Sequence, residues 1–538
     1  MLETQITETN IEAPPKMVEL PKTEHFKKPS NLPFYAKDRA KTTLLFGGLT
    51  EAHEQLILGH LTGLGYNVEI LPCPDFESFQ TGKEFCNRAQ CNPTYFTIGN
   101  LIKHLKLKAK ESSVEEIEKN YVFVTAGSCG PCRFGMYEAE YRKAVVDAGF
   151  ENFRVQIMQQ TAGVGQIAYD GERPGLDLNK DFFLGFLQSI LIGDCINQMM
   201  YKIRPYEIEE GATLRAKKRA MEIVQKALET KSGLYKALHE VKRVFGDIEC
   251  DYTRIKPKIK VTGEFWASIT EGDGNYHLKN WLNEEGGEVL QEPLTGWVEH
   301  LLFSREIKAR DRRGIEQEAR GLGKGANAYK SEAKLFFYRR VLNGVYNFYR
   351  SALGFKPDNT VNNRVLAKYA DAYYSTRQGG GEAYMEVGNL IHCAKINKVH
   401  MMLSVKPFGC MPSTASDGVQ SKVMNDYPKI VFLPIETSGD SEVNFKSRVQ
   451  MKLFEAKQKA KAEAEKVTKE FGIDLEAVEK FVARNPQYRK GDFKVPHRKA
   501  AASTGMNFIL EMHYRMNTLR GKLRHKVSSA LYFAQGML

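Results

Sequence analysis

Apolar and polar positions in the first third of the chain form a pattern whose period changes at regular intervals. Short runs rich in β-branched and aromatic residues are followed by segments in which apolar residues recur every three or four positions. The runs that predict strands are TTLLFGG (42–48), NVEILP (67–72), YVFVTAG (121–127) and FRVQIM (153–158), and helices are predicted between them over 51–65 and 135–149. Alternating strands and helices of these lengths predict a parallel sheet with helices on both faces.

A second unit of the same kind is predicted near the C-terminus. Strand-like runs at 399–405 and 430–436 have helices before and between them, whereas 184–355 is mainly helical, with a few strands expected near 258–268. The predicted fold class is therefore α/β with two parallel-sheet lobes. The expected regions are an extended N-terminal arm (1–38), a first α/β lobe (39–210), a mainly helical middle region (211–356), a second α/β lobe (357–450) and a helical, basic C-terminal region (451–538).

Composition narrows the class of protein. Hydrophobic residues make up 42% and charged residues 26% of the 538 residues, which is typical of a folded globular protein. The N-terminus lacks the basic-then-apolar order of a signal peptide, and we find no apolar run near the ~20 residues that span a bilayer. We expect a cytoplasmic protein with no membrane partner. In that compartment the nine cysteines are expected to be metal ligands or redox groups rather than disulfides.

The net charge of +12 suits an anionic partner such as nucleic acid, a phosphate-bearing cofactor or an acidic protein. From Asn485 to Leu538 the chain carries ten Lys and Arg against two acids, Asp492 and Glu511. This basic tail is either a docking element or a solvated helix whose apolar residues pack on the body. Nucleic-acid binding is not expected, because aromatic residues are not interleaved with the basic ones.

Several cysteines occupy loops where chemistry is expected. Cys129 and Cys132 form a CxxC directly after the strand at 121–127, and Cys410 likewise follows a strand. Ligand-facing loops of parallel sheets lie at the carboxyl ends of the strands. Cys86 and Cys91 lie in a loop that leads into a helix. A thioredoxin-like redox pair and a zinc half-site are the competing interpretations of the CxxC.

The remaining cysteines carry weaker signals. Cys393 lies on a predicted helix, where a buried, inert thiol is the ordinary interpretation and a metal ligand the alternative. Inert thiols are expected at Cys73, Cys195 and Cys250. Thiolates from several strand-end loops are the usual ligands of an iron–sulfur cluster. The sequence contains no P-loop, GxGxxG dinucleotide motif or HExxH helix, so another chain is expected to bind ATP if ATP is used.

Four segments together resemble one known superfamily. GKEFCNRAQCNPTYFTIGNL, TAGSCGPCRFGMYEAEYRKAVVDAGF, GDCINQMMYKIRPYE and the stretch that begins VKPFGCMPSTASDG resemble the 2-hydroxyacyl-CoA dehydratase and benzoyl-CoA reductase superfamily. The similarity is greatest to the dehydratase-like region of the large CoA-substrate-specific activase proteins, with the double-cubane cluster proteins as cousins. It covers roughly 40–210 and 380–455.

The resemblance implies two flavodoxin-like lobes around an iron–sulfur cluster. A single 4Fe–4S cluster would be held by Cys91, Cys132 and Cys410, the positions that match the family motifs. Cys86, Cys129 and Cys393 would complete the six ligands of a double-cubane cluster.

The resemblance also implies a function. An ATP-hydrolysing activator protein would deliver a low-potential electron for radical dehydration of a 2-hydroxyacyl-CoA or reduction of a small molecule. The activator domain of the large relatives is not present in these 538 residues, so a separate activator is expected. The alternative function is a non-catalytic electron carrier or scaffold that docks a partner through the basic tail. Homodimer and heterodimer both stay open.

Overall fold

The first lobe is built around a four-stranded parallel sheet. The computed structural model describes residues 33–127, 132–159, 172–313, 327–354, 362–378 and 381–536. The strands β1 (Thr43–Phe46), β2 (Asn67–Ile70), β3 (Tyr121–Gly127) and β4 (Arg154–Gln159) lie in the order β2-β1-β3-β4. The helices of this part are α1 (Glu51–Gly63), α2 (Phe76–Phe85), α3 (Asn92–Lys108), α4 (Val114–Asn120) and α5 (Tyr137–Asp147). The strands predicted from the sequence are all present.

The second lobe repeats this architecture with a sheet of the same strand order. Its strands β5 (Lys258–Gly263), β6 (Glu288–Gln291), β7 (Met401–Pro407) and β8 (Val431–Thr437) are parallel and lie in the order β6-β5-β7-β8. Two parallel-sheet α/β lobes are therefore confirmed. The helices of this part are α9 (Phe265–Ile269), α10 (Leu278–Glu284), α11 (Leu294–Asp311), α12 (Ala328–Ala352), α13 (Asn363–Ala370), α14 (Ala383–Lys395), α15 (Met411–Asp426) and α16 (Glu442–Glu470).

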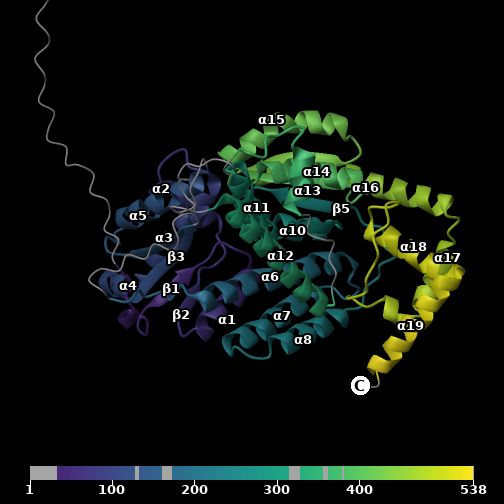
Figure 1. Ribbon diagram of the computed structural model, residues 1–538, viewed down its shortest axis with the longest axis horizontal. Helices are drawn as coiled ribbons and strands as arrows, with labels where there is room; N and C mark the ends of the chain where they lie inside the picture. The colour runs from purple at the N-terminus through teal and green to yellow at the C-terminus, as the bar shows by residue number, and fades with distance from the viewer. Residues whose placement is uncertain are drawn as a thin grey trace, which may run out of the picture.

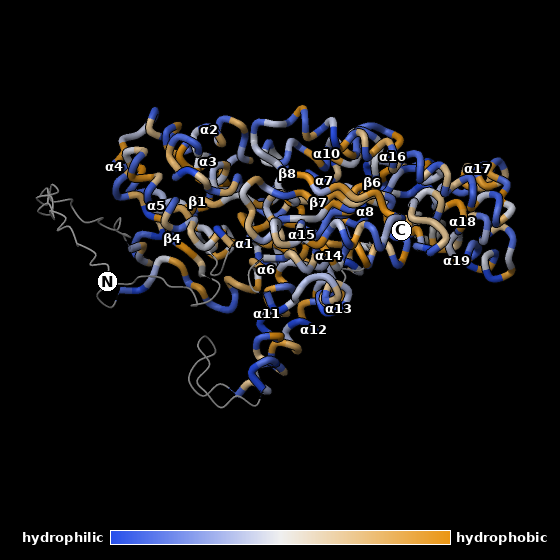
Figure 2. Tube along the Cα trace, turned by 90° about the horizontal axis from the view of Figure 1, so that it is seen from above, coloured by the Kyte–Doolittle hydropathy of each residue, from blue (hydrophilic) through white to orange (hydrophobic). Residues whose placement is uncertain are grey.

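The second lobe begins well before the expected boundary at 356. β5 lies where a few strands were expected near 258–268, whereas β6 was expected to be helical, and β5 pairs with β7, Ile259 opposite Met401. β5 has the sequence KIKVTG and is buried along its whole length, so it lacks the alternation of apolar and polar residues that identifies a half-buried strand, and it contains two lysines. Its place in the sheet therefore depends on pairing with a strand that is distant in sequence. Figure 2 shows the apolar strands β6 and β7 in the interior, with the α11–α12 pair projecting from the body.

A layer of helices joins the two lobes. It is formed by α6 (Lys180–Ile203), α7 (Ala212–Glu229) and α8 (Leu234–Gly246), and α7 packs on α1 of the first lobe. Within α6, Asp194 accepts hydrogen bonds from the backbone N–H groups of Leu294 (2.8 Å) and Thr295 (2.7 Å), which begin α11. His53 of α1 lies 3.3 Å from the same carboxylate. The lobes thus share a buried polar contact.

One segment among the described residues is long and apolar enough to cross a membrane. It is Lys180–Tyr206, and 67% of its apolar window is buried inside the fold. A buried helix of a water-soluble core passes the same test of length and composition. This segment is not predicted from the sequence as a continuous apolar run, because polar residues interrupt it.

The chain termini differ in their packing. Phe34 is buried on the first lobe and Tyr35 pairs with Pro174, whereas the rest of the expected N-terminal arm, 1–32, lies outside the described residues. The C-terminal part forms α17 (Leu475–Ala483), α18 (Thr504–Asn517) and α19 (Leu519–Gly536) at the end of the molecule opposite the first lobe (Figure 1). Phe508 of α18 enters the core of the helical layer.

Candidate functional site

The carboxyl ends of the inner strands of both sheets meet at one cavity. Strand order reverses between β1 and β3 in one lobe and between β5 and β7 in the other, and ligands of such sheets bind outside these switch points. A cavity of about 430 Å³ lies there. Its lining includes the residues that follow the four inner strands, namely Gly47, Cys132, Glu264 and Cys410. The site therefore belongs to both lobes.

Three thiols face this cavity from comparable positions. Cys91, Cys132 and Cys410 all line it, and each is the residue that precedes a helix: α3, the short 3₁₀ helix Arg133–Met136, and α15. A proline in the first turn favours helix initiation after Cys91 and Cys410. The partial positive charge at the N-terminus of an α-helix stabilises a nearby thiolate. Cys91 and Cys410 have this environment.

The loops that carry the thiols are held together by backbone contacts. The N–H of Asn92 donates to the carbonyl of Phe408 (3.3 Å), and the Arg133 guanidinium donates to the carbonyl of Ala89. Gly409 has φ +80°, and a Cβ there would lie 3.2 Å from Nη1 of Arg133 and 3.6 Å from Cα of Cys91. Glycine is favoured at this position because of its positive φ, and a Cβ would require only a small shift of the Arg133 side chain.

Burial dominates the electrostatics of the thiols. It raises the pKa of Cys132 to about 12 and that of Cys410 further, with added contributions from the Glu264 and Glu382 carboxyls. The Cys91 sulfur lies 3.1 Å from the Tyr137 hydroxyl and 3.4 Å from Oγ1 of Thr94. The raised pKa values keep the Cys132 and Cys410 thiols neutral until a metal binds and displaces the proton.

Two partly buried carboxyls of the second lobe also line the cavity. Glu264 and Glu382 both line it, and their carboxylate oxygens accept from the N–H groups of Ala267 (2.8 Å) and Phe265 (2.9 Å) respectively. Burial, with repulsion from neighbouring carboxyls, raises the pKa of Glu264 to about 7 and that of Glu382 to about 8. A large fraction of these two carboxyls is therefore protonated at neutral pH.

Sequence analysis missed both carboxyls. Glu264 directly follows the strand β5. Strands were expected near 258–268, but none was assigned to a sheet, so Glu264 was not identified as a residue at the carboxyl end of a strand. Glu382 follows the GGG at 379–381, which marks only a loop.

The outer part of the cavity is aromatic and cationic. The rings of Phe265 and Trp297 lie 4.9 Å apart, and Trp266 is buried with no hydrogen-bond partner for its Nε1 among the described residues. Arg305 and Lys308 of α11 are exposed and line the same cavity. An indole N–H, aromatic faces and cations together suit a ligand with a carbonyl group and an anionic part.

The other proposed ligands are not brought to the cavity. Cys86 ends α2 and is buried in the first-lobe core, with Tyr95 close to both Cys86 and Cys91. Cys393 is buried on α14 in a different apolar cluster, near Lys260 and Glu292. Cys129 lies outside the described residues. A six-ligand set is thus not assembled by the part of the chain that is described.

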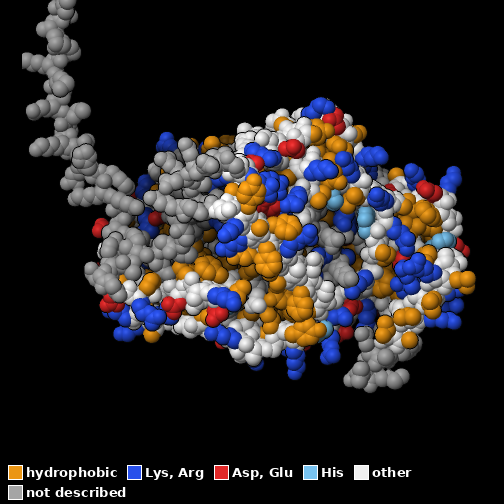
Figure 3. Space-filling model, viewed as in Figure 1, with side chains coloured by type: hydrophobic (Ala, Val, Ile, Leu, Met, Phe, Trp, Pro, Cys, Tyr) orange, Lys and Arg blue, Asp and Glu red, His pale blue; other side chains and the backbone are white. Residues whose placement is uncertain are grey.

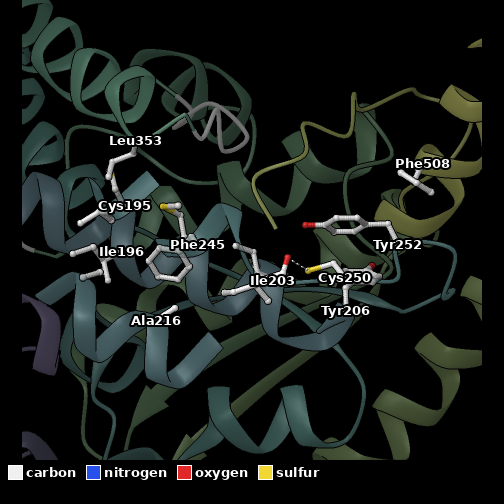
Figure 4. Packing of buried hydrophobic residues seen from close by; sticks show 14 of the residues in the cluster. Cys195, Ile196, Ile203, Tyr206, Ala216, Phe245, Cys250, Tyr252, Leu353 and Phe508 are labelled. Atoms are coloured by element: carbon white, nitrogen blue, oxygen red, sulfur yellow. Dashed lines mark hydrogen bonds between the residues drawn. The ribbon is translucent and has the colours of Figure 1, made fainter. Parts of the chain in front are cut away.

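Two cysteines expected to be inert lie in the core of the helical layer. Figure 4 shows Cys195 beside Ile196 and Leu353, and Cys250 beside Tyr252 and Ile203. The Cys250 thiol donates to the carbonyl of Ile248 (3.8 Å). Burial raises the pKa of Cys250 to about 12 and that of Cys195 further. Both thiols lack access to the cavity.

The arrangement can be tested against the needs of a metal. Within the described ranges, no three side chains of His, Cys, Asp and Glu gather closely enough to hold a single metal ion. The thiolates of an iron–sulfur cubane bind separate irons and stand farther apart than the ligands of one ion. Among the described residues, Cys91, Cys132 and Cys410 line one cavity without forming such a group, so they do not make the closed tetrahedral set of a structural zinc site.

Comparison with known proteins adds no assignment. Neither the family models nor the curated proteins searched contain a match to this chain. The function is therefore inferred from the cavity between the lobes and from the residues that line it.

Proposed function

We propose that this chain is an iron–sulfur protein of the 2-hydroxyacyl-CoA dehydratase type, which accepts low-potential electrons and reduces an acyl-CoA or related carbonyl compound. The observation that carries the proposal is the convergence of Cys91, Cys132 and Cys410 on one cavity. These residues lie on three loops distant in sequence, and each matches a motif position of the resembled superfamily. Cys132 and Cys410 follow the inner strands β3 and β7, and Cys91 reaches the same cavity from the loop before α3.

The three thiols would hold a 4Fe–4S cluster, which when bound supplies one low-potential electron at the cavity. Two helix N-termini favour the charged thiolates of Cys91 and Cys410. The Tyr137 hydroxyl, 3.1 Å from the Cys91 sulfur, would donate to that thiolate and raise the reduction potential.

Glu264 and Glu382 would hold protons beside the site of reduction. Their raised pKa values, about 7 and about 8, keep a transferable proton on a carboxyl oxygen near neutral pH. Reduction of a carbonyl group adds negative charge to its oxygen, and a nearby acid stabilises that charge. The first lobe has no carboxyl of this kind among the described residues that line the cavity.

The wall of the cavity would bind the substrate. The Trp266 indole N–H, which has no partner among the described residues, would donate to a carbonyl oxygen. Phe265 and Trp297 would cover an apolar group, and Arg305 with Lys308 would bind an anionic part such as a phosphate. A pure electron carrier needs no such cavity, and its volume of about 430 Å³ favours the catalytic alternative.

The electron would come from a separate protein. The proposed partner is an ATP-hydrolysing activator protein, which the resemblance to the dehydratase superfamily implies.

The test is anaerobic purification followed by iron and sulfide analysis and electron paramagnetic resonance. The wild type should hold about four irons per chain if one cluster is present and about eight if the cluster is a double cubane. Cys91→Ser, Cys132→Ser and Cys410→Ser should each lose most of the iron and alter the resonance signal.

The matched control is Cys195→Ala, which removes a buried thiol that the cavity does not contain. It should keep the full iron content. Zinc in place of iron, or iron retained by all three serine variants, would overturn the proposal. Loss of iron from Cys393→Ala as well would favour the double cubane.

A further inference from the structure

The C-terminal helix α19 turns its apolar side away from the protein. Leu519, Leu523, Val527 and Leu531 recur every fourth residue, and their exposed fractions are 90%, 62%, 54% and 61%. At 3.6 residues per turn, these side chains form one stripe along the helix. An amphipathic surface helix normally buries its apolar stripe in the core. In α19 the stripe is exposed over three helical turns.

Polar contacts fix this orientation. The Tyr488 hydroxyl and Nδ1 of His525 are 2.7 Å apart, and Nε2 of Gln487 donates to the Ser529 hydroxyl (3.0 Å). Gly521 lies against the backbone of Tyr514, where a Cβ would overlap the carbonyl oxygen. His525, Ser529 and Gly521 thus form the side of α19 that faces the body. The stripe is presented without any rearrangement of the helix.

Cations follow both edges of the stripe. Arg520 and Arg524 lie along one edge, and Lys522 and Lys526 lie along the other, by the helical spacing. Leu519–Gly536 contains no acidic residue. Glu511 of α18 is buried and accepts from Arg498 (2.7 Å) and Arg515 (2.9 Å), and Nη1 of Arg524 lies 3.9 Å from the same carboxylate, so Arg524 is partly neutralised while Arg520, Lys522 and Lys526 are not paired with Glu511. The exposed field around the stripe is therefore positive.

The surrounding surface extends this field. Ten Lys and Arg stand against two acids from Asn485 to Leu538, and Figure 3 shows lysine and arginine side chains interspersed with apolar ones over the C-terminal end of the molecule. Figure 1 places α19 at the periphery of the molecule, far from β1 and β3 of the first lobe. Cations spread over a broad area suit an extended anionic surface better than they suit a ligand in a narrow groove.

A second copy of the chain is a poor occupant. If two α19 helices paired through their apolar stripes, the cations along both edges of one helix would face the cations of the other helix, whether the two helices were parallel or antiparallel. Like charges in this position oppose association.

We propose that α19 docks the protein onto an anionic membrane surface, with the four apolar side chains entering the headgroup region and the flanking cations contacting lipid phosphates. Long basic side chains reach outward from such a stripe while their aliphatic parts stay apolar. The attachment is peripheral, and it does not depend on the function proposed for the cavity.

The test is co-sedimentation with vesicles of phosphatidylcholine alone and of phosphatidylcholine with roughly one third phosphatidylglycerol. The wild type should bind the anionic vesicles at least about tenfold more tightly, and binding should weaken as salt is raised. Leu523→Asp/Val527→Asp should lower binding to the level of phosphatidylcholine alone. Lys522→Gln/Lys526→Gln should weaken it by several fold.

The matched control is Met451→Asp/Phe454→Asp on α16, whose side chains are 64% and 62% exposed and which adds the same charge. It should bind like the wild type. Failure to prefer anionic vesicles, or equal loss in the control, would overturn the proposal. A wild-type dimer that Leu523→Asp/Val527→Asp dissociates would overturn it as well, because a second copy would then cover the stripe. Circular dichroism verifies that each variant is folded.

Discussion

The first lobe orders its strands β2-β1-β3-β4 and the second β6-β5-β7-β8, so the two sheets have the same topology with every strand parallel. Their contributions to the cavity differ. Cys91 and Cys132 come from the first lobe, whereas the second adds Cys410 together with the carboxyls of Glu264 and Glu382. The shared topology explains why side chains of both lobes meet at the cavity, to which both lobes bring thiols while, among the described residues, the carboxyls with raised pKa values come from the second lobe alone.

The largest expected effect comes from the glycine that ends the first strand of the second sheet. Gly263 has φ +126°, and a Cβ there would overlap the backbone of Val405. In the first lobe, a Cβ on Gly47 would lie 3.0 Å from a Leu71 side-chain atom without a positive φ. We expect Gly263→Ala to lower the free energy of unfolding by roughly 4 kcal/mol or more, and Gly47→Ala by about 1 kcal/mol. Urea denaturation measures both, and equal losses would contradict the comparison.

The contact between the lobes is the next target. Asp194→Ala would leave the first N–H groups of α11 and the buried His53 without their carboxylate. We expect a loss of about 3 kcal/mol in the free energy of unfolding. Glu476→Ala, which removes an exposed carboxylate on α17 paired with Lys480, should cost less than about 0.5 kcal/mol. A small effect at Asp194 would mean that the lobes do not depend on this contact.

A pH experiment separates buried carboxyls of the two lobes. Burial raises the pKa of Glu54 on α1 to about 8 and contributes most of the rise of Glu264 to about 7. Each native carboxyl keeps a proton that the unfolded chain releases, so stability falls as pH rises from about 4.5 toward 8. Glu54→Gln and Glu264→Gln should each remove part of this fall, and Glu54→Gln should remove more because the pKa of Glu54 is raised further. Thermal unfolding of the metal-free protein at several pH values measures it.

The same two variants should differ in thiol chemistry. Glu264 contributes to the raised pKa of Cys132 and Cys410, so Glu264→Gln should speed alkylation of these thiols at pH above about 7. Glu54→Gln should leave the rate unchanged. Equal acceleration in both variants would contradict the separate roles of the lobes.

The smallest effect is expected at Cys393. It is buried on α14 in an apolar cluster that does not line the cavity. Cys393→Ala removes one buried sulfur, and we expect it to lower the free energy of unfolding by about 1 kcal/mol while the iron content stays at the wild-type level. Iron analysis and urea denaturation of one preparation measure both. Loss of iron from this variant would contradict the expectation and would indicate that the metal site includes Cys393 in the core of the second lobe.

Local patterns predicted most of the elements. The strands of the first sheet and β7 and β8 of the second were expected from their apolar runs, because residues close in sequence decide whether a strand or a helix forms. The positions of Cys132 and Cys410 after strands followed from the same patterns. β6, by contrast, has only four residues, two of them polar, and its role depends on pairing with β5.

The sequence by itself determined the α/β class, the two strand-end thiols and the basic character of the tail, since each depends on residue type and local spacing. Only the tertiary structure decided that Glu264 and Glu382 join the thiols, that Cys393 does not, and that α19 exposes its apolar stripe. The physical reason is that these outcomes depend on contacts between segments far apart in the chain. Their geometry is set by how sheets and helices pack, which no local pattern records.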